Sequence, residues 1–146
     1  MELSPHFTTA EMTRTAVRRF AEINAVLSPT EEASLRALCT TLLEPIRAHF
    51  GRPIFVHSGF RCPDLNAAIG GSKTSQHMKA EAVDFDIPGV PLTDVWAWIW
   101  KESGLAYGQC LLEGHVQGKP GWIHLSLGEP WRPAGKSRQH FKIEDA

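Results

Sequence analysis

Two short segments with alternating side chains constrain this chain most, residues 82–87 (AVDFDI) and residues 122–127 (WIHLSL). Because successive side chains of a β-strand point to opposite faces, each segment predicts a strand with one apolar and one polar face. Asp84 lies on the polar face of the first strand, and His124 lies on the polar face of the second. If the two strands are neighbours, Asp84 and His124 meet on the same side of one sheet.

Capping patterns predict helices ahead of these strands. Thr8 with Glu11 and Ser28 with Glu31 each form a capping box, and the second also has a proline in its first turn. Behind the second box an apolar stripe recurs at helical spacing (Leu35, Leu38, Leu42, Ile46). Pro45 is expected to bend or end that helix, because proline lacks a backbone donor.

The order of the remaining elements indicates the fold class. Further helices are expected over residues 63–69 and 92–103, and further strands over residues 53–57 and 109–113. Helices come first and strands later, without regular alternation. We therefore predict an α+β fold, a mainly antiparallel sheet with helices packed on it.

Length and charge exclude several classes of protein. The 146 residues fit one domain, which we assign to residues 1–128, followed by a polar, proline-containing C-terminal extension over residues 129–146. A formal net charge of -1 gives no basic footprint for nucleic acid. No apolar run is long enough to cross a bilayer, and no secretion signal is found, so we expect synthesis in the cytoplasm. The oligomeric state stays open.

His77, on the segment entering the first strand, completes a candidate metal site with Asp84 and His124. The chain has three cysteines but no CxxC pair, so a metal ion needs such other ligands. Two histidines and one carboxylate leave the fourth position of tetrahedral zinc open for water, which is typical of a catalytic site. Zinc lowers the pKa of that water toward about 7. A single histidine is more often structural than a ligand, so spacing alone makes the triplet a hypothesis.

A wider set of motifs resembles one known family. The motifs are residues 58–61 (SGFR), Asn66, residues 70–72 (GGS), the run from 75–77 (SQH) to 82–84 (AVD), and residues 122–124 (WIH). They resemble the zinc D-alanyl-D-alanine carboxypeptidase and dipeptidase family, whose fold is shared with the hedgehog signalling domain. The resemblance covers nearly the whole chain and points to the compact branch common in bacteriophages and prophages. It implies a hedgehog-like fold and a Zn²⁺ ion bound by His77, Asp84 and His124.

The resemblance also implies roles for two residues near the metal, Arg61 and Ser75. Arg61 matches the arginine that anchors substrate and polarises the scissile carbonyl, and a guanidinium suits a carboxylate or a developing oxyanion. Ser75 matches a residue that binds substrate, although a turn-forming hydroxyl is an equal alternative. Independently of the resemblance, His57 would share a strand face with Phe55 near Arg61, so we expect it to line the cleft as a substrate-binding residue, with a half-buried structural histidine as the alternative.

The general base is the main departure from the family pattern. Many relatives place an acid three residues before the last histidine, where this chain has Gly121. Glu113, at the end of the expected strand 109–113, fits the place that the base takes in the compact branch. We therefore predict Glu113 as the general base, with His115 in the same loop held in reserve. A second, small departure is Ala80, which stands where relatives have glycine.

The function implied by the resemblance is hydrolysis of a peptide bond in peptidoglycan stem peptides. The domain would act as a carboxypeptidase or as an endolysin-like endopeptidase, after release by a phage- or prophage-type route. One alternative is a zinc-containing binding module of the same fold without turnover, which Gly121 favours. Another is a phage structural protein that uses the fold as a scaffold. Zinc content and wall hydrolysis together separate the three.

Overall fold

The computed structural model describes residues 1–128 and 139–142. Its α-helices are α1 (Thr9–Thr13), α2 (Ala21–Asn24), α3 (Pro29–Leu38), α4 (Glu44–Phe50), α5 (Pro63–Ala68) and α6 (Leu92–Lys101). Between them stand the short 3₁₀ helices η1 (Arg18–Phe20) and η3 (Gln76–Lys79) and the π-helical turn η2 (Cys39–Leu43). The strands are β1 (Glu2–Ser4), β2 (Phe7–Thr8), β3 (Phe55–Ser58), β4 (Ala82–Asp86), β5 (Tyr107–Glu113), β6 (Trp122–Leu127) and β7 (Gln139–Lys142).

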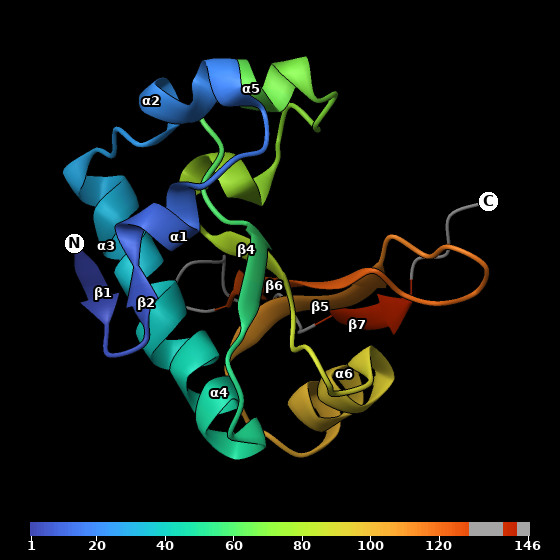
Figure 1. Cartoon of the computed structure of the whole chain (residues 1–146). Coiled ribbons are helices and arrows are strands. Elements are labelled where there is room, and N and C mark those ends of the chain that lie inside the picture. Colours follow the sequence, from blue (N-terminus) through green and yellow to red (C-terminus); the bar gives the residue numbers. More distant parts are fainter. Residues whose placement is uncertain (129–138, 143–146) are drawn as a thin grey trace.

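One sheet organises the described chain, with its strands in the order β3-β4-β6-β5-β7. All neighbours run antiparallel except β5 and β7, which are parallel. Helices pack around this sheet (Figure 1), which confirms the predicted α+β fold with a mainly antiparallel sheet. Strand β7 comes from the segment that we assigned to a C-terminal extension, so part of that segment joins the sheet.

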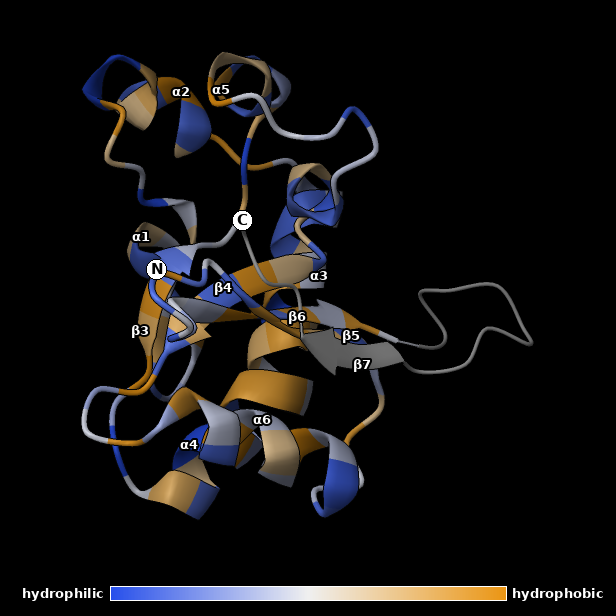
Figure 2. Ribbon diagram, turned by 90° about the vertical axis from the view of Figure 1, so that its right-hand side faces the viewer, coloured by the Kyte–Doolittle hydropathy of each residue, from blue (hydrophilic) through white to orange (hydrophobic). Residues whose placement is uncertain are grey.

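The predicted alternation holds in both central strands. Val83 and Phe85 of β4 and Ile123 and Leu125 of β6 have no exposed surface, and they face the core that α3, α4 and α6 cover. Figure 2 shows hydrophobic stretches of α6 next to the strands. The opposite face of the same strands is free of these helices and carries the polar residues. The functional candidates therefore lie on one side of the sheet and the core on the other.

The helix from Ser28 continues past the predicted break. Both hydrogen bonds of the Ser28 capping box are present, and the apolar stripe is buried (Leu35, Leu38, Leu42, Ile46). Pro45 does not end the helix, which was one of the two expected outcomes. The π-helical turn η2 precedes it, and Pro45 stands in the first turn of α4, where its missing donor is tolerated. The helix ends instead at Gly51, whose φ of 63° is left-handed.

The cysteines are free and buried, as expected. Burial raises the pKa of the Cys39 thiol and of the Cys110 thiol to about 12. Protonated thiols are poor metal ligands, which agrees with a metal site built from other side chains. Among the described residues, no helix has the length and apolar character that a membrane crossing requires.

Asn24 fastens the backbone on both sides of Arg61. Its amide nitrogen donates to the carbonyl oxygens of Thr13 (2.7 Å) and Phe60 (3.0 Å), and its Oδ1 accepts from the backbone N–H of Cys62 at 2.7 Å. The side chain has no exposed surface, so water cannot replace these partners. The segment that carries Arg61 therefore depends on a residue that is distant in sequence.

We expect Asn24→Ala to lower the free energy of unfolding by about 3 kcal/mol, because it leaves buried backbone groups without partners. Urea denaturation followed by circular dichroism measures the loss. Glu22→Ala, an exposed change on the same short helix, is the control and should shift stability by no more than about 0.5 kcal/mol. A loss below about 1 kcal/mol for Asn24→Ala would contradict the stabilising role of the Asn24 hydrogen bonds.

Candidate metal centre

Asp84 stands between the two histidines of the predicted triplet. Strands β4 and β6 pair so that Asp84 lies directly opposite His124. Oδ1 of Asp84 is 2.9 Å from Nδ1 of His124 and 3.3 Å from Nε2 of His77. One ligand atom from each of the three residues lies within 4.8 Å of the others. The structure therefore brings the triplet together as a group that can hold a metal ion.

The short helix η3 carries His77 and positions it in this group. Ser75 caps η3, and its Oγ accepts a hydrogen bond from the backbone N–H of His77. The imidazole Nδ1 lies 2.7 Å from the carbonyl oxygen of Gly59, an acceptor that leaves Nε2 for the Asp84 side. Ala80 ends the helix with a φ of 60°, a left-handed conformation that favours glycine.

The charge on Asp84 suits a cation. Burial alone raises the pKa of this carboxyl, but hydrogen bonds with His124 and then with His77 outweigh that effect. The net result is a pKa well below the ordinary range of aspartate. The carboxylate is therefore ionised at neutral pH, as a metal ligand must be. The donor set of two imidazole nitrogens and one carboxylate oxygen fits zinc with an open fourth position.

Arg61 lines the same cavity as the three candidate metal ligands. Its Nη2 donates to Oγ of Ser75 at 3.3 Å, and its backbone N–H donates to the carbonyl of His77. Burial lowers the pKa of the guanidinium, while Asp84 and Glu113 act in the opposite direction. Among the described residues, Nε of Arg61 is buried without a hydrogen-bond partner. The guanidinium thus keeps donor capacity for a ligand, whereas Ser75 is engaged as a helix cap and as the partner of Arg61.

Glu113 lies on the metal-facing side of the sheet. On β5, Leu111 pairs with His124 and Glu113 pairs with Trp122, so the Glu113 side chain shares the face of His124. Trp122 Nε1 donates to Glu113 Oε1 at 3.2 Å, and both residues line the cavity of Asp84. Glu113 therefore lies on the face that the predicted base requires, and its catalytic role stays a prediction.

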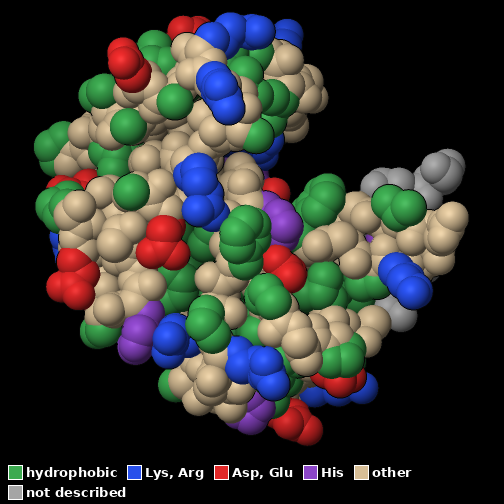
Figure 3. All heavy atoms as spheres, viewed as in Figure 1, with side chains coloured by type: hydrophobic (Ala, Val, Ile, Leu, Met, Phe, Trp, Pro, Cys, Tyr) green, Lys and Arg blue, Asp and Glu red, His purple; other side chains and the backbone are tan. Residues whose placement is uncertain are grey.

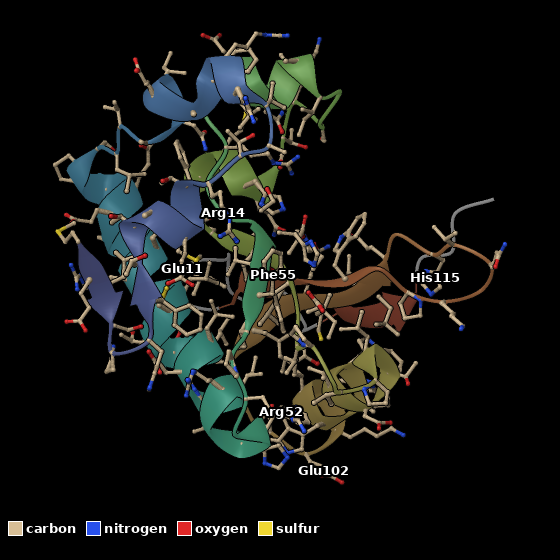
Figure 4. All side chains as sticks on the ribbon, in the orientation of Figure 1. Glu11, Arg14, Arg52, Phe55, Glu102 and His115 are labelled. Atoms are coloured by element: carbon tan, nitrogen blue, oxygen red, sulfur yellow. The ribbon has the colours of Figure 1, made fainter. Side chains whose placement is uncertain are left out.

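His115, the alternative base, and Gly121, where an acid was expected from the family pattern, both lie in the hairpin that follows Glu113. His115 lies on this projecting loop (Figure 4) and is not among the residues that line the cavity. Gly121 bonds through its N–H to the carbonyl of Glu113, so it stands close to the end of β5. A Cβ at position 121 would come within 2.9 Å of the carbonyl oxygen of Gly114. An acid at 121 would require the backbone to shift.

His57 points to a different hollow from the one predicted. It lines a smaller cavity of about 290 Å³ together with Arg14 and Phe55, and it is absent from the lining of the metal cavity. Its Nε2 lies 2.7 Å from Oδ1 of Asp86, so the Asp86 carboxylate is the hydrogen-bond partner of His57. The ring is 6.4 Å from the ring of Trp122, which places it just outside the candidate site.

The metal cavity itself has a volume of about 900 Å³. Figure 3 shows a hollow on one side of the molecule, with histidine and acidic atoms at its inner end. Polar and charged side chains dominate the lining and include both cations and carboxylates (Arg61, Lys79, Glu81, Glu113). A site of this size and polarity suits a peptide segment better than a small apolar ligand.

Gln76 is a site residue that the sequence reasoning did not single out. Its Oε1 lies 3.1 Å from Nε2 of His124, and both residues line the metal cavity. The only signal in the sequence is its place between Ser75 and His77. A pairing between residues 48 positions apart cannot be read from that place.

Comparison with known proteins agrees with the motifs. The family model described as peptidase M15 matches residues 5–125 and so includes every residue of the candidate metal centre. No curated protein gives a match to the chain. Since the family match covers most of the sequence, the chain belongs to the peptidase M15 family.

Proposed function

We propose that this protein is a zinc peptidase that hydrolyses a peptide bond in the stem peptides of bacterial peptidoglycan. The observation that carries the proposal is the group formed by His77, Asp84 and His124, placed at the inner end of a polar cavity in a chain of a peptidase family. A zinc ion bound there would act as a Lewis acid and lower the pKa of a water molecule. The chain's own residues supply the rest of the chemistry.

We expect Glu113 to act as the general base and Arg61 to bind the substrate. Glu113, on the face of His124, is placed to take a proton from water and to pass it to the leaving amine. Arg61 lines the cavity and has a guanidinium nitrogen without a hydrogen-bond partner among the described residues, so we expect it to bind the scissile carbonyl or a neighbouring carboxylate. Stem peptides carry free carboxylates, and Arg61 and Lys79 provide cations in the lining for them.

The direct test is incubation of the purified protein with isolated wall peptides, with mass spectrometry of the products. We expect two fragments whose masses add to that of the substrate plus one water. A metal chelator should stop the reaction, and added zinc should restore it. Absence of cleavage across fragments that contain every type of stem-peptide bond would overturn the proposal.

A zinc-containing binding module without turnover is the second candidate, and Gly121 is the observation that favours it. Glu113 in the cavity argues for the enzyme instead, because it supplies a carboxylate on the metal-facing side. The binding module predicts that wall peptides bind in the presence of zinc but remain intact. The mass-spectrometric assay therefore separates the two candidates.

We expect Arg61→Ala to lower the rate of hydrolysis by about a hundredfold, because it removes a donor aimed at the reacting carbonyl. Zinc content should stay unchanged, since Arg61 is not part of the metal-binding group. Arg52→Ala is the matched control, because Arg52 lies beyond α4, away from the cavity (Figure 4), and should retain full activity. Full activity of the Arg61→Ala protein would show that the arginine has no catalytic role.

A further inference from the structure

The two imidazoles of the metal centre use opposite ring nitrogens. His77 directs Nε2 at Asp84 and gives Nδ1 to the carbonyl oxygen of Gly59, whereas His124 directs Nδ1 at Asp84. The second nitrogen of His124, Nε2, lies 3.1 Å from Oε1 of Gln76. The His124 ring is thus held from both ends, by a carboxylate on β4 and by an amide on η3.

A neutral imidazole binds a metal through the nitrogen that lacks the proton, so the other nitrogen must carry the proton and donate it. In His124 the nitrogen that faces Asp84 is Nδ1, and if Nδ1 binds the ion, Nε2 must be the donor. Only 12% of the His124 side chain is exposed, so an N–H without a partner there carries a desolvation cost. Oε1 of Gln76 is the acceptor that satisfies it.

The backbone around Gln76 holds this acceptor in place. The carbonyl of Gln76 accepts hydrogen bonds from the backbone N–H groups of Ala80 and Glu81 at the end of η3. The carbonyl of Glu81 in turn accepts from the N–H of Leu127 on β6, the strand that carries His124. The amide and the imidazole are therefore tied through a short path of backbone bonds.

We infer that Gln76 is a positioning residue that sets the tautomer and the ring orientation of His124, so that Nδ1 faces the metal ion. This inference rests on the proposed function, which takes the ion to be zinc. His77 needs no such side chain, because a backbone carbonyl performs the same task for it. Gln76 consequently links the two ligand histidines, since it neighbours one in sequence and orients the other in space.

The test measures zinc affinity by competition with a chelating dye, without any substrate. Gln76→Met keeps the size of the side chain and removes the acceptor, and it should weaken zinc binding by about 10- to 100-fold. Gln76→Glu keeps an acceptor in the same place and should restore affinity to at least the level of the natural protein. Gln109→Met changes another glutamine that lines the cavity, and we expect its affinity to stay within about twofold.

A second readout reports the tautomer itself. Nitrogen NMR of the zinc-loaded protein should show the proton of His124 on Nε2, with the Gln76→Met variant broadened or shifted at this position. Circular dichroism of the metal-free variants checks that all of them fold. Equal zinc affinity of the folded Gln76→Met protein and the natural protein would overturn the inference, as would failure of Gln76→Glu to restore binding. If the natural protein itself binds no zinc, the proposed function fails, which is a separate result.

Discussion

Glu113→Gln should retain zinc and lower hydrolysis of wall peptides by a factor between about 10² and 10⁴, the usual contribution of a positioned general base. The substitution keeps the shape of the side chain and its acceptor oxygen, so the hydrogen bond from Trp122 can persist. It removes only the basicity. Elemental analysis of the purified variant and a timed assay on wall fragments measure the two properties in the same preparation.

The control for this prediction is His115→Ala. His115 lies in the same hairpin but does not line the cavity, so its removal should leave the rate within a few-fold of the natural protein. Nδ1 of His115 is buried and has no hydrogen-bond partner among the described residues, so the loss of this nitrogen breaks no hydrogen bond within the described part of the chain. If Glu113→Gln cuts at the normal rate while His115→Ala does not, the base is His115.

The alternating strands are the part of the site that the sequence predicted best. A period of two assigns each side chain to a face, and burial of one face leaves little choice of register. Asp84 therefore faces His124 in the structure as the pattern predicted, and Glu113 shares their side. Pairing between β4 and β6 was a condition in that reasoning, and the sheet order β3-β4-β6 meets it.

Contacts that depend on tertiary geometry were not predictable in the same way. Pro45 was expected to bend or end its helix, but the helix continues through a π-helical turn into α4, where Pro45 stands in the first turn and its missing donor is tolerated. Gln76 and Asn24 act through hydrogen bonds to partners far along the chain, and no local pattern encodes such partners. His57 has the expected alternation but stands on β3, one strand beyond Asp84, and there it lines the smaller cavity.

Replacing both His77 and His124 by alanine should abolish stoichiometric zinc binding and, with it, all hydrolysis. The natural protein should contain about one zinc ion per chain when purified without chelators. The double variant leaves Asp84 as the sole member of the group, and one carboxylate offers too few ligands to hold the ion. Because a ligand that binds only the folded state raises its stability, zinc should raise the melting temperature of the natural protein but not that of the variant. The matched control is His57→Ala with His115→Ala, two histidines outside the metal-binding group, and it should keep both the ion and the thermal shift. Circular dichroism of both metal-free proteins establishes that each double variant is folded. One zinc ion per chain in the His77→Ala, His124→Ala protein would mean that the metal binds elsewhere and that the proposed centre is wrong.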